Sequence, residues 1–350
     1  MMRTIPRMSR IPQFKYEDPL DRLWLDTALA IGFSVRRSSE VYASTNGKGV
    51  LTIGSPETLD SDDSLAQMIF HELCHSLVEG PESLEREDWG LSNYDDKDQS
   101  REYACLRLQA ALTTPRGLRW FFAPTTDHRP YYDALPEDPL PPGRDPIVVA
   151  ARQGAWFAER DPWAPHLALA LDATRDIAQT MRARAPSVGS LWTRVDPLPP
   201  LHASGLARSV GSRAEKNCGE CAWFVHGRSL RGRCRQADKR VDASLSACER
   251  WEPSLDCQEC GACCREAYGA VEVSAKDPFA KKHPELLVLG LEGRRTLQRT
   301  GSRCAHLEGG NSANEQYACN VYEDRPRTCR DFTLGSEHCL TARRRVGLSR

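Results

Sequence analysis

The chain has 350 residues, with 47 Lys and Arg against 48 Asp and Glu, so its formal net charge is −1 at pH 7. This balance argues against a nucleic acid or an anionic membrane surface that is recognised by bulk charge. No run of 18 apolar residues occurs, and the opening MMRTIPRMSRIPQ lacks the apolar stretch of a signal peptide, so we expect a cytoplasmic protein without a membrane partner.

The first predicted elements are a helix and a hairpin. Residues 18–34 place apolar side chains at roughly helical spacing and reach a stop at Gly32. Two short β-prone runs follow, at residues 41–44 and 50–53, and they flank the turn sequence NGKG. A glycine-rich turn between two such runs predicts a β-hairpin.

Further helices are predicted downstream. The strongest covers residues 61–80, because SDD offers an N-cap and Gly-Pro a stop. Two others cover about 97–113 and 164–184, and the proline-rich residues 123–148 predict loops over these helices. Residues 185–217 shift to Pro, Ser, Gly and Arg, a composition typical of a linker.

Cysteine usage separates the two ends of the chain. Twelve of the fourteen cysteines lie between Cys218 and Cys339, and only Cys74 and Cys105 lie outside. Because disulfides are rare in a reducing compartment, such crowding indicates metal ligation. A disulfide-stapled exported domain is the alternative, and it requires a secretion signal. Cys74 and Cys105 are interpreted as small core residues.

The predicted helix 61–80 contains the sequence HELCH, with His71 and His75 four residues apart. Two histidines at this spacing share one helix face and can bind a single cation, with Glu72 beside its open side. Zinc held by three protein ligands keeps one position for water, and a neighbouring carboxylate can accept the proton of that water. We therefore predict a zinc site with Glu72 as the general base.

This stretch resembles the zincin metallopeptidases over roughly residues 40–113. The resemblance implies that the strand before the active helix, residues 50–53, aligns a peptide substrate by edge pairing. No third histidine follows the motif as in the elongated zincin signature, so the third ligand is expected to be a carboxylate from a following helix. Glu102 is the first choice because it begins the second strong helix. Competing ligands are Glu85, Asp88, Asp95 and Asp98, and candidates to stabilise an oxyanion are Tyr103, His128, Tyr131 and Tyr132.

A second set of metal ligands follows the linker. Cys218, Cys221, Cys234 and Cys248 have the pattern C-x2-C-x12-C-x13-C, whose first pair is spaced to grip one metal. Four thiolates make a closed site. This set therefore predicts a structural zinc ion or an iron–sulfur cluster rather than a catalytic metal.

The third set fills the last part of the chain, where the segments CQECGACCR, CNVYEDRPRTCRDF and SEHCLTARRRVGL resemble the CxxCxxCC family, the YkgJ-like zinc- or iron-chelating proteins. The resemblance implies metal chelation, with an iron–sulfur cluster as the expected species. Eight thiols exceed one four-ligand site, so either two metals bind or some cysteines are spare. Arg325 and Arg330 are expected to offset thiolate charge. The cysteines are Cys257, Cys260, Cys263, Cys264, Cys304, Cys319, Cys329 and Cys339.

Together these patterns predict an α+β protein: a mainly helical, zincin-like domain with a small sheet at 1–184, a linker at 185–217, a four-cysteine module at 218–252 and an irregular cysteine-rich domain at 256–350. The expected function is a zinc-dependent peptidase or amide hydrolase with a zinc- or iron–sulfur-binding tail. The alternative is a metal-binding or electron-transfer protein in which the HELCH domain is a scaffold. The presence of Glu72 favours the hydrolase, because a scaffold does not need a general base at this position. The oligomeric state is left open.

Overall fold

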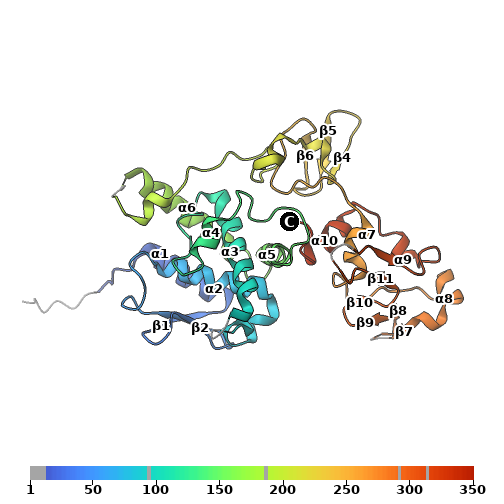
Figure 1. The fold of residues 1–350 in the computed structure, drawn as a ribbon, viewed down its shortest axis with the longest axis horizontal. Coiled ribbons are helices and arrows are strands. Elements are labelled where there is room, and N and C mark those ends of the chain that lie inside the picture. The colour runs from blue at the N-terminus through green and yellow to red at the C-terminus, as the bar shows by residue number, and fades with distance from the viewer. Residues whose placement is uncertain (1–12, 93–95, 185–187, 291–292, 313–314) are drawn as a thin grey trace, which may run out of the picture.

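The computed structural model describes residues 13–92, 96–184, 188–290, 293–312 and 315–350. Helices dominate the first part of the chain and small sheets are scattered through the rest, so the fold is α+β, as predicted (Figure 1). The helices of the first part are α1 (Pro19–Ile31), α2 (Leu65–Glu79), α3 (Gln99–Thr113), α4 (Arg129–Asp133), α5 (Pro146–Phe157) and α6 (His166–Arg184).

One three-stranded sheet accompanies these helices. It consists of β1 (Ser34–Ser38), β2 (Ala43–Thr45) and β3 (Val50–Gly54) in the order β1-β3-β2. The predicted hairpin is present, with β2 antiparallel to β3, but β1 pairs with β3 in parallel on its other side. The expectation that residues 50–53 form an exposed edge strand is therefore wrong, because β3 is the central strand.

The core of the helical domain lies where α2, α3 and α5 pack against one another. Trp24 of α1 is fully buried, with its ring centroid 5.4 Å from that of Phe70 on α2. The indole of Trp163 donates a hydrogen bond of 2.9 Å to the Ser76 hydroxyl on α2. The buried α2 thus contacts α1, α3 and α5 on three sides.

Residues 123–148 are predicted to form loops. In the structure a short stretch of them forms α4, and the last residues begin α5.

The N-terminus of α2 carries a capping box at Ser64. The Ser64 hydroxyl accepts a hydrogen bond from the Gln67 backbone at 3.1 Å, and the Gln67 side chain accepts one from the Ser64 backbone at 2.8 Å. We expect Ser64→Ala to lower the free energy of unfolding by about 1 kcal/mol, because orphan N–H groups of the first turn lose a partner. Urea titration followed by circular dichroism measures the change. Ser61→Ala, outside the cap, is the matched control, and equal effects of the two substitutions would contradict the prediction.

The four-cysteine module is built on a small antiparallel sheet of β4 (Phe224–Val225), β5 (Arg231–Cys234) and β6 (Lys239–Asp242). Part of the predicted linker belongs to it. Arg208 bridges to Cys248 and Asn217 to Ser246, and Ser204 is only 3% exposed. Residues 207–217 therefore pack with the module instead of forming a free tether, because several of their backbone groups pair with residues 245–249.

The tail is assembled from short elements joined by turns. Its two-stranded sheets are β7–β8, β9–β10 and β11–β12. Their bounds are β7 (Leu287–Leu289), β8 (Arg295–Leu297), β9 (Arg299–Thr300), β10 (Arg303–Cys304), β11 (Leu307–Gly309) and β12 (Tyr317–Cys319), and the helices are α7 (Cys257–Cys260), α8 (Pro278–Lys282), α9 (Arg327–Arg330) and α10 (Glu337–Arg345). Helix α10 lies against α5 of the helical domain (Figure 1).

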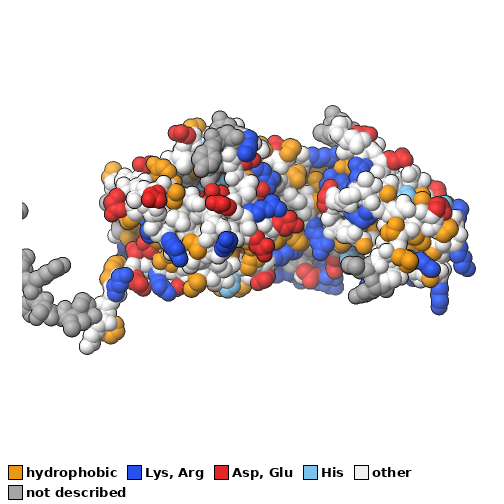
Figure 2. Space-filling view, turned by 90° about the horizontal axis from the view of Figure 1, so that it is seen from below, with side chains coloured by type: hydrophobic (Ala, Val, Ile, Leu, Met, Phe, Trp, Pro, Cys, Tyr) orange, Lys and Arg blue, Asp and Glu red, His pale blue; other side chains and the backbone are white. Residues whose placement is uncertain are grey.

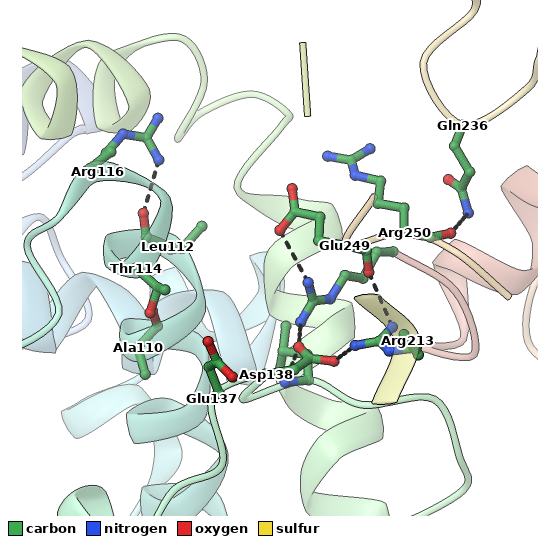
Figure 3. A network of polar contacts seen from close by, with 12 residues as sticks. Ala110, Leu112, Thr114, Arg116, Glu137, Asp138, Arg213, Gln236, Glu249 and Arg250 are labelled. Carbon is green, nitrogen blue, oxygen red and sulfur yellow. Dashed lines mark hydrogen bonds and ion pairs between the residues drawn. The ribbon is translucent and has the colours of Figure 1, made fainter. Parts of the chain in front are cut away.

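Charged side chains tie the three parts together where the chain ends. Asp138 of the helical domain accepts hydrogen bonds from Arg213 of the module and from Arg350 (Figure 3). Arg350 also pairs with Glu249 at 3.1 Å, and Arg250 donates to Glu159 at 2.6 Å. Asp138 thus forms ion pairs with two arginines whose side chains are each about one-tenth exposed. These pairs link all three parts in one junction.

The face of the molecule in Figure 2 carries both charged and hydrophobic side chains. On the face shown in Figure 2, side chains of both charge signs are interspersed, with hydrophobic atoms scattered between them. Among the described residues, no helix combines the length and the apolar character needed to cross a membrane.

Candidate metal centres

The two histidines of the HELCH sequence lie side by side on α2. Their Nε2 atoms are 3.1 Å apart, and the imidazole planes are nearly perpendicular. His75 is buried, whereas the His71 side chain is about one-fifth exposed. The helical spacing of four residues thus brings two ligand atoms to one point that solvent can reach.

Glu102 brings a third candidate ligand to the two histidines. It lies in the first turn of α3, and its carboxylate oxygens are 3.0 Å from the Nε2 atom of His75 and 3.7 Å from that of His71. Ligands on a tetrahedral zinc ion, bound at about 2.1 Å, lie about 3.4 Å apart. The separations of 3.0, 3.1 and 3.7 Å match that spacing.

Two of the four competing acidic residues are engaged in other hydrogen bonds. An Asp88 oxygen accepts a hydrogen bond from the Thr45 backbone, and Asp98 accepts one from the Ser92 backbone. Glu85 lies in a short 3-10 helix after α2, and Asp95 is outside the described residues. The geometry therefore favours Glu102 among the predicted third ligands.

Gln109, which the sequence did not single out, sets the tautomer of His71. Its Oε1 atom can only accept a hydrogen bond, so the Nδ1 atom of His71, 3.0 Å away, carries the proton. The Gln109 amide nitrogen donates to the Phe122 carbonyl, which fixes the orientation of the amide. The Nε2 lone pair of His71 is therefore free for a metal.

We expect Gln109→Leu to lower the zinc affinity of the helical domain by about 10- to 100-fold, the usual cost of removing a partner of a metal-bound histidine. Without Gln109, His71 can take the other tautomer and turn its Nε2 proton toward the site. Competition with a chromophoric chelator measures the affinity. Unchanged affinity in a variant with native circular dichroism would contradict this role.

Cys105 also approaches the histidines. Ligand atoms of His71, His75 and Cys105 all lie within 4.8 Å of one another, and the Cys105 sulfur is 3.8 Å from the Nδ1 atom of His71. That atom is on the ring side opposite Nε2, but Cys105 also lies beside His75, so it is a further candidate ligand of this group. Burial raises the pKa of the Cys105 thiol, and a hydrogen bond to Cys74 raises it further. Both thiols are fully buried, as predicted for core residues.

The electrostatics of the histidine site favour a carboxylate beside positive charge. Burial alone would raise the pKa of Glu102, but His71 and His75 lower the pKa to about 2. Burial opposes charge on His71, yet the Cys105 sulfur and the Glu102 carboxylate outweigh it and raise the pKa of His71. A buried carboxylate stabilised by neighbouring positive charge equally suits a bound cation.

Glu72, the predicted general base, is buried and held by one neighbour. The indole nitrogen of Trp89 donates a hydrogen bond of 2.8 Å to a Glu72 carboxylate oxygen. Trp89 has φ near +60°, a left-handed conformation that is uncommon for a bulky residue, and its ring lies edge-on to Phe33. The turn at Trp89 thus orients the carboxylate of Glu72.

Of the residues proposed to stabilise an oxyanion, three form one ring cluster, and His128 of this cluster lies near the Glu102 carboxylate. Tyr103 stacks on Tyr131 with ring centroids 3.8 Å apart, and its ring meets His128 edge-on at 6.0 Å. Tyr132 is different, because it is fully buried and its hydroxyl donates to the Arg119 carbonyl. Tyr132 is therefore committed to the core.

The four cysteines of the module lie in one neighbourhood, although no three of their sulfur atoms come within 4.8 Å of one another. Cys218 and Cys234 share one apolar cluster, against which Cys221 packs. Burial raises the pKa of Cys248 to about 12, and the neighbouring Cys234, Cys221 and Cys218 raise it further, whereas the Arg250 backbone amide opposes the rise. Clustered buried thiols lose their protons readily only beside a cation, so this donor set fits a metal.

His202, from the segment predicted as a linker, contacts this cluster. Its Nε2 atom is 3.3 Å from the Cys218 sulfur. The Ser204 backbone amide donates to the Nδ1 atom at 3.0 Å, so in the neutral ring the proton is on Nε2. His202 therefore donates an N–H···S hydrogen bond to Cys218 and is not itself placed as a ligand.

All eight cysteines of the tail are free thiols. Cys339 packs with Trp223 and Cys221 of the module. Cys260 and Cys263 pack in one apolar neighbourhood, and Cys264, Cys304 and Cys329 pack in another. Cys263 and Cys264 meet where these neighbourhoods adjoin, with sulfur atoms 3.8 Å apart. Arg325 lies near Cys264, as predicted, whereas Arg330 lies near Asp277. Sulfur donors beside guanidinium groups fit zinc or an iron–sulfur cluster.

Comparison with known proteins bears on the tail. No curated protein matches the chain, and no solved structure matches it. The predicted zincin resemblance thus has no supporting match. Residues 256–344 match the model of the CxxCxxCC family, whose description is "Putative zinc- or iron-chelating domain". The tail is therefore similar to zinc- or iron-chelating domains, and metal binding is the property that this match supports.

Proposed function

We propose that the helical domain is a zinc-dependent hydrolase of the zincin type that cleaves peptide or other amide bonds. One observation carries the proposal: the Nε2 atoms of His71 and His75 and the Glu102 carboxylate surround one point at separations of 3.0 to 3.7 Å. Gln109 supports it by directing the Nε2 lone pair of His71 toward that point.

Each residue has a distinct role in the proposed reaction. A zinc ion held by His71, His75 and Glu102 would supply Lewis acidity for attack of water on a substrate carbonyl. Glu72 accepts the proton of the attacking water, with Trp89 holding one carboxylate oxygen in place. His128, which lies near the Glu102 carboxylate and contacts the ring of Tyr103, is the first candidate to stabilise negative charge on the substrate.

A peptide substrate would need a free strand edge. Because β3 is central, both β1 and β2 are edge strands, and we choose β2, which is antiparallel to β3, because its end contacts residues beside the site. The end of β2 is tied to the site: the Thr45 backbone donates to Asp88, and the adjacent Trp89 donates to Glu72. A peptide paired with β2 would thus approach the carboxylate that serves as base.

The test uses the full chain, purified anaerobically, with its zinc content measured and its cleavage of a peptide library followed by mass spectrometry. We expect cleavage that is lost on chelation and restored by zinc. His75→Ala should lose both the zinc of the helical domain and the activity. Cleavage that persists in His75→Ala without that zinc would refute the assignment.

A second candidate function rests on the tail, where the family match supports zinc or iron chelation. In it, the tail is an iron–sulfur module that transfers electrons or senses redox state, in a reducing, cytoplasmic setting that keeps the thiols free. Anaerobic protein is then expected to be brown and to release acid-labile sulfide. Colourless protein with zinc in the tail would contradict the iron–sulfur assignment.

A further inference from the structure

Helices α2 and α3 carry the candidate zinc ligands on the faces where they meet. His71 of α2 contacts Gln109 of α3 at 3.0 Å, and His75, one turn later, contacts Glu102 at 3.0 Å. The contacts move toward the N-terminus of α3 as α2 is followed toward its C-terminus, so the two helices are antiparallel. Glu79 is the next residue on this face of α2, one further turn after His75. It therefore lies opposite the start of α3.

Arg101, in the first turn of α3, contacts the C-terminal end of α2 twice. Its Nε atom donates a hydrogen bond of 2.5 Å to the Glu79 carboxylate, and a second guanidinium nitrogen donates one of 2.6 Å to the Val78 carbonyl. The Arg101 side chain is about one-third exposed and that of Glu79 about one-sixth, so water screens this pair only in part. Two bonds from one planar guanidinium group fix the orientation of the contact as well as its distance.

The contact at Arg101 lies where both helix ends need support. Among the described residues, Asp98 at the N-cap of α3 makes no side-chain hydrogen bond to the first turn, and its carboxylate accepts one from the Ser92 backbone instead. Helix α2 has no basic residue in its last turn, and the Val78 carbonyl is among the last four, which have no partner within a helix. Arg101 thus brings a cation to the C-terminus of α2, where the helix dipole favours one.

Glu102, the candidate third ligand, directly follows Arg101 in the same turn of α3. Its carboxylate oxygens are 3.0 Å from the Nε2 atom of His75 and 3.7 Å from that of His71. Ligand distances at a zinc site stay within about 0.2 Å of about 2.1 Å, so a small slide of α3 along α2 would remove these oxygens from the site. Gln109 holds the same face of α3 farther along the helix. The Arg101 contact holds its beginning, next to the ligand.

We propose that Arg101 is a positioning residue of the zinc site: by binding the end of α2, it fixes the first turn of α3 and thereby places Glu102 on the metal. The inference rests on the proposed zinc site of the helical domain, and it adds a residue that binds no metal itself. A merely structural ion pair would change the stability of the fold and leave the zinc affinity unaltered.

Zinc affinity of the full chain, purified anaerobically, tests this role by competition with a chromophoric chelator. The His75→Ala variant reports the zinc held elsewhere in the chain, and its signal is subtracted. We expect Arg101→Met to weaken zinc binding at the helical site by about 10- to 100-fold, the usual range for residues that orient metal ligands. Arg101→Lys keeps the charge but not the planar fork, so it should recover part of this loss. Ser64→Ala, which weakens the opposite end of α2, is the control for lost stability and should leave the affinity unchanged.

A double-mutant cycle with Glu102 separates positioning from stability. Once Glu102→Gln has removed the ligand, adding Arg101→Met should cost no further zinc affinity, because Arg101 acts through that carboxylate. Additive losses would overturn the positioning role, and so would unchanged affinity in both Arg101 variants while the wild-type site holds zinc. Wild-type protein that binds no more zinc than His75→Ala would overturn the zinc site itself and this role with it. If circular dichroism shows that Arg101→Met does not fold, Arg101→Lys carries the same cycle.

Discussion

Hydrolysis should fall by about two to four orders of magnitude in Glu72→Gln, the usual size of a general-base contribution. Glutamine is nearly isosteric, and its amide oxygen can still accept the hydrogen bond from Trp89, but it cannot accept a proton from water. His71, His75 and Glu102 remain in place, so the zinc content should persist. Peptide cleavage and elemental analysis of the same preparation measure both quantities.

Two further variants make this result specific. His71→Ala removes a ligand and should lose zinc together with activity, which separates loss of the base from loss of the metal. Glu82→Gln changes an exposed glutamate just after α2, paired only with Arg86 at the surface, and should leave turnover unchanged. Full activity in Glu72→Gln with zinc still bound would eliminate the proposed mechanism and leave the tail as the better candidate for function.

Metal removal should unfold the second part of the chain selectively. Structural zinc contributes about 10–16 kcal/mol to small domains at neutral pH, and such domains unfold when chelated. Among the described residues of 218–350 the apolar clusters are small, whereas the helical domain has an extended core. After treatment with a chelator under reducing conditions, limited proteolysis should digest the cysteine-rich part and leave a helical fragment.

Restoring zinc, or iron with sulfide, before proteolysis provides the control for this experiment, since it should restore protection. A cysteine-rich part that resists digestion after complete metal loss would show that packing alone holds it. The junction at Asp138 predicts a secondary effect. When the tail unfolds, Asp138 loses Arg350 as a partner, so the helical fragment should melt at a slightly lower temperature than the same domain in the full chain.

Local patterns predicted the elements that carry the histidine site. The capped helix α2, the hairpin of β2 and β3 and the helix that starts near Glu102 each follow from caps, turn residues and periodicity over a few positions. The strand β1 could not be predicted in this way. Its sequence SVRRS has little apolar character, and its pairing with β3 is its evident support.

Residues that orient the candidate ligands were invisible to the same reasoning because their partners are distant in the sequence. Gln109 contacts a histidine 38 positions away, Trp89 a glutamate 17 positions away and His202 a cysteine 16 positions away. No motif spacing encodes these contacts in a single sequence. His202 was hidden further by the Pro- and Ser-rich composition around it, which resembles a linker.

The uneven distribution of apolar packing has a thermodynamic consequence. One cluster of buried side chains runs through the helical domain from Leu20 to Val195, whereas the clusters of the cysteine-rich part contain three or four buried residues each. The heat capacity change of unfolding arises mainly from the exposure of apolar surface. The stability of the helical domain should therefore curve strongly with temperature, while that of the tail should vary almost linearly and follow the availability of metal instead.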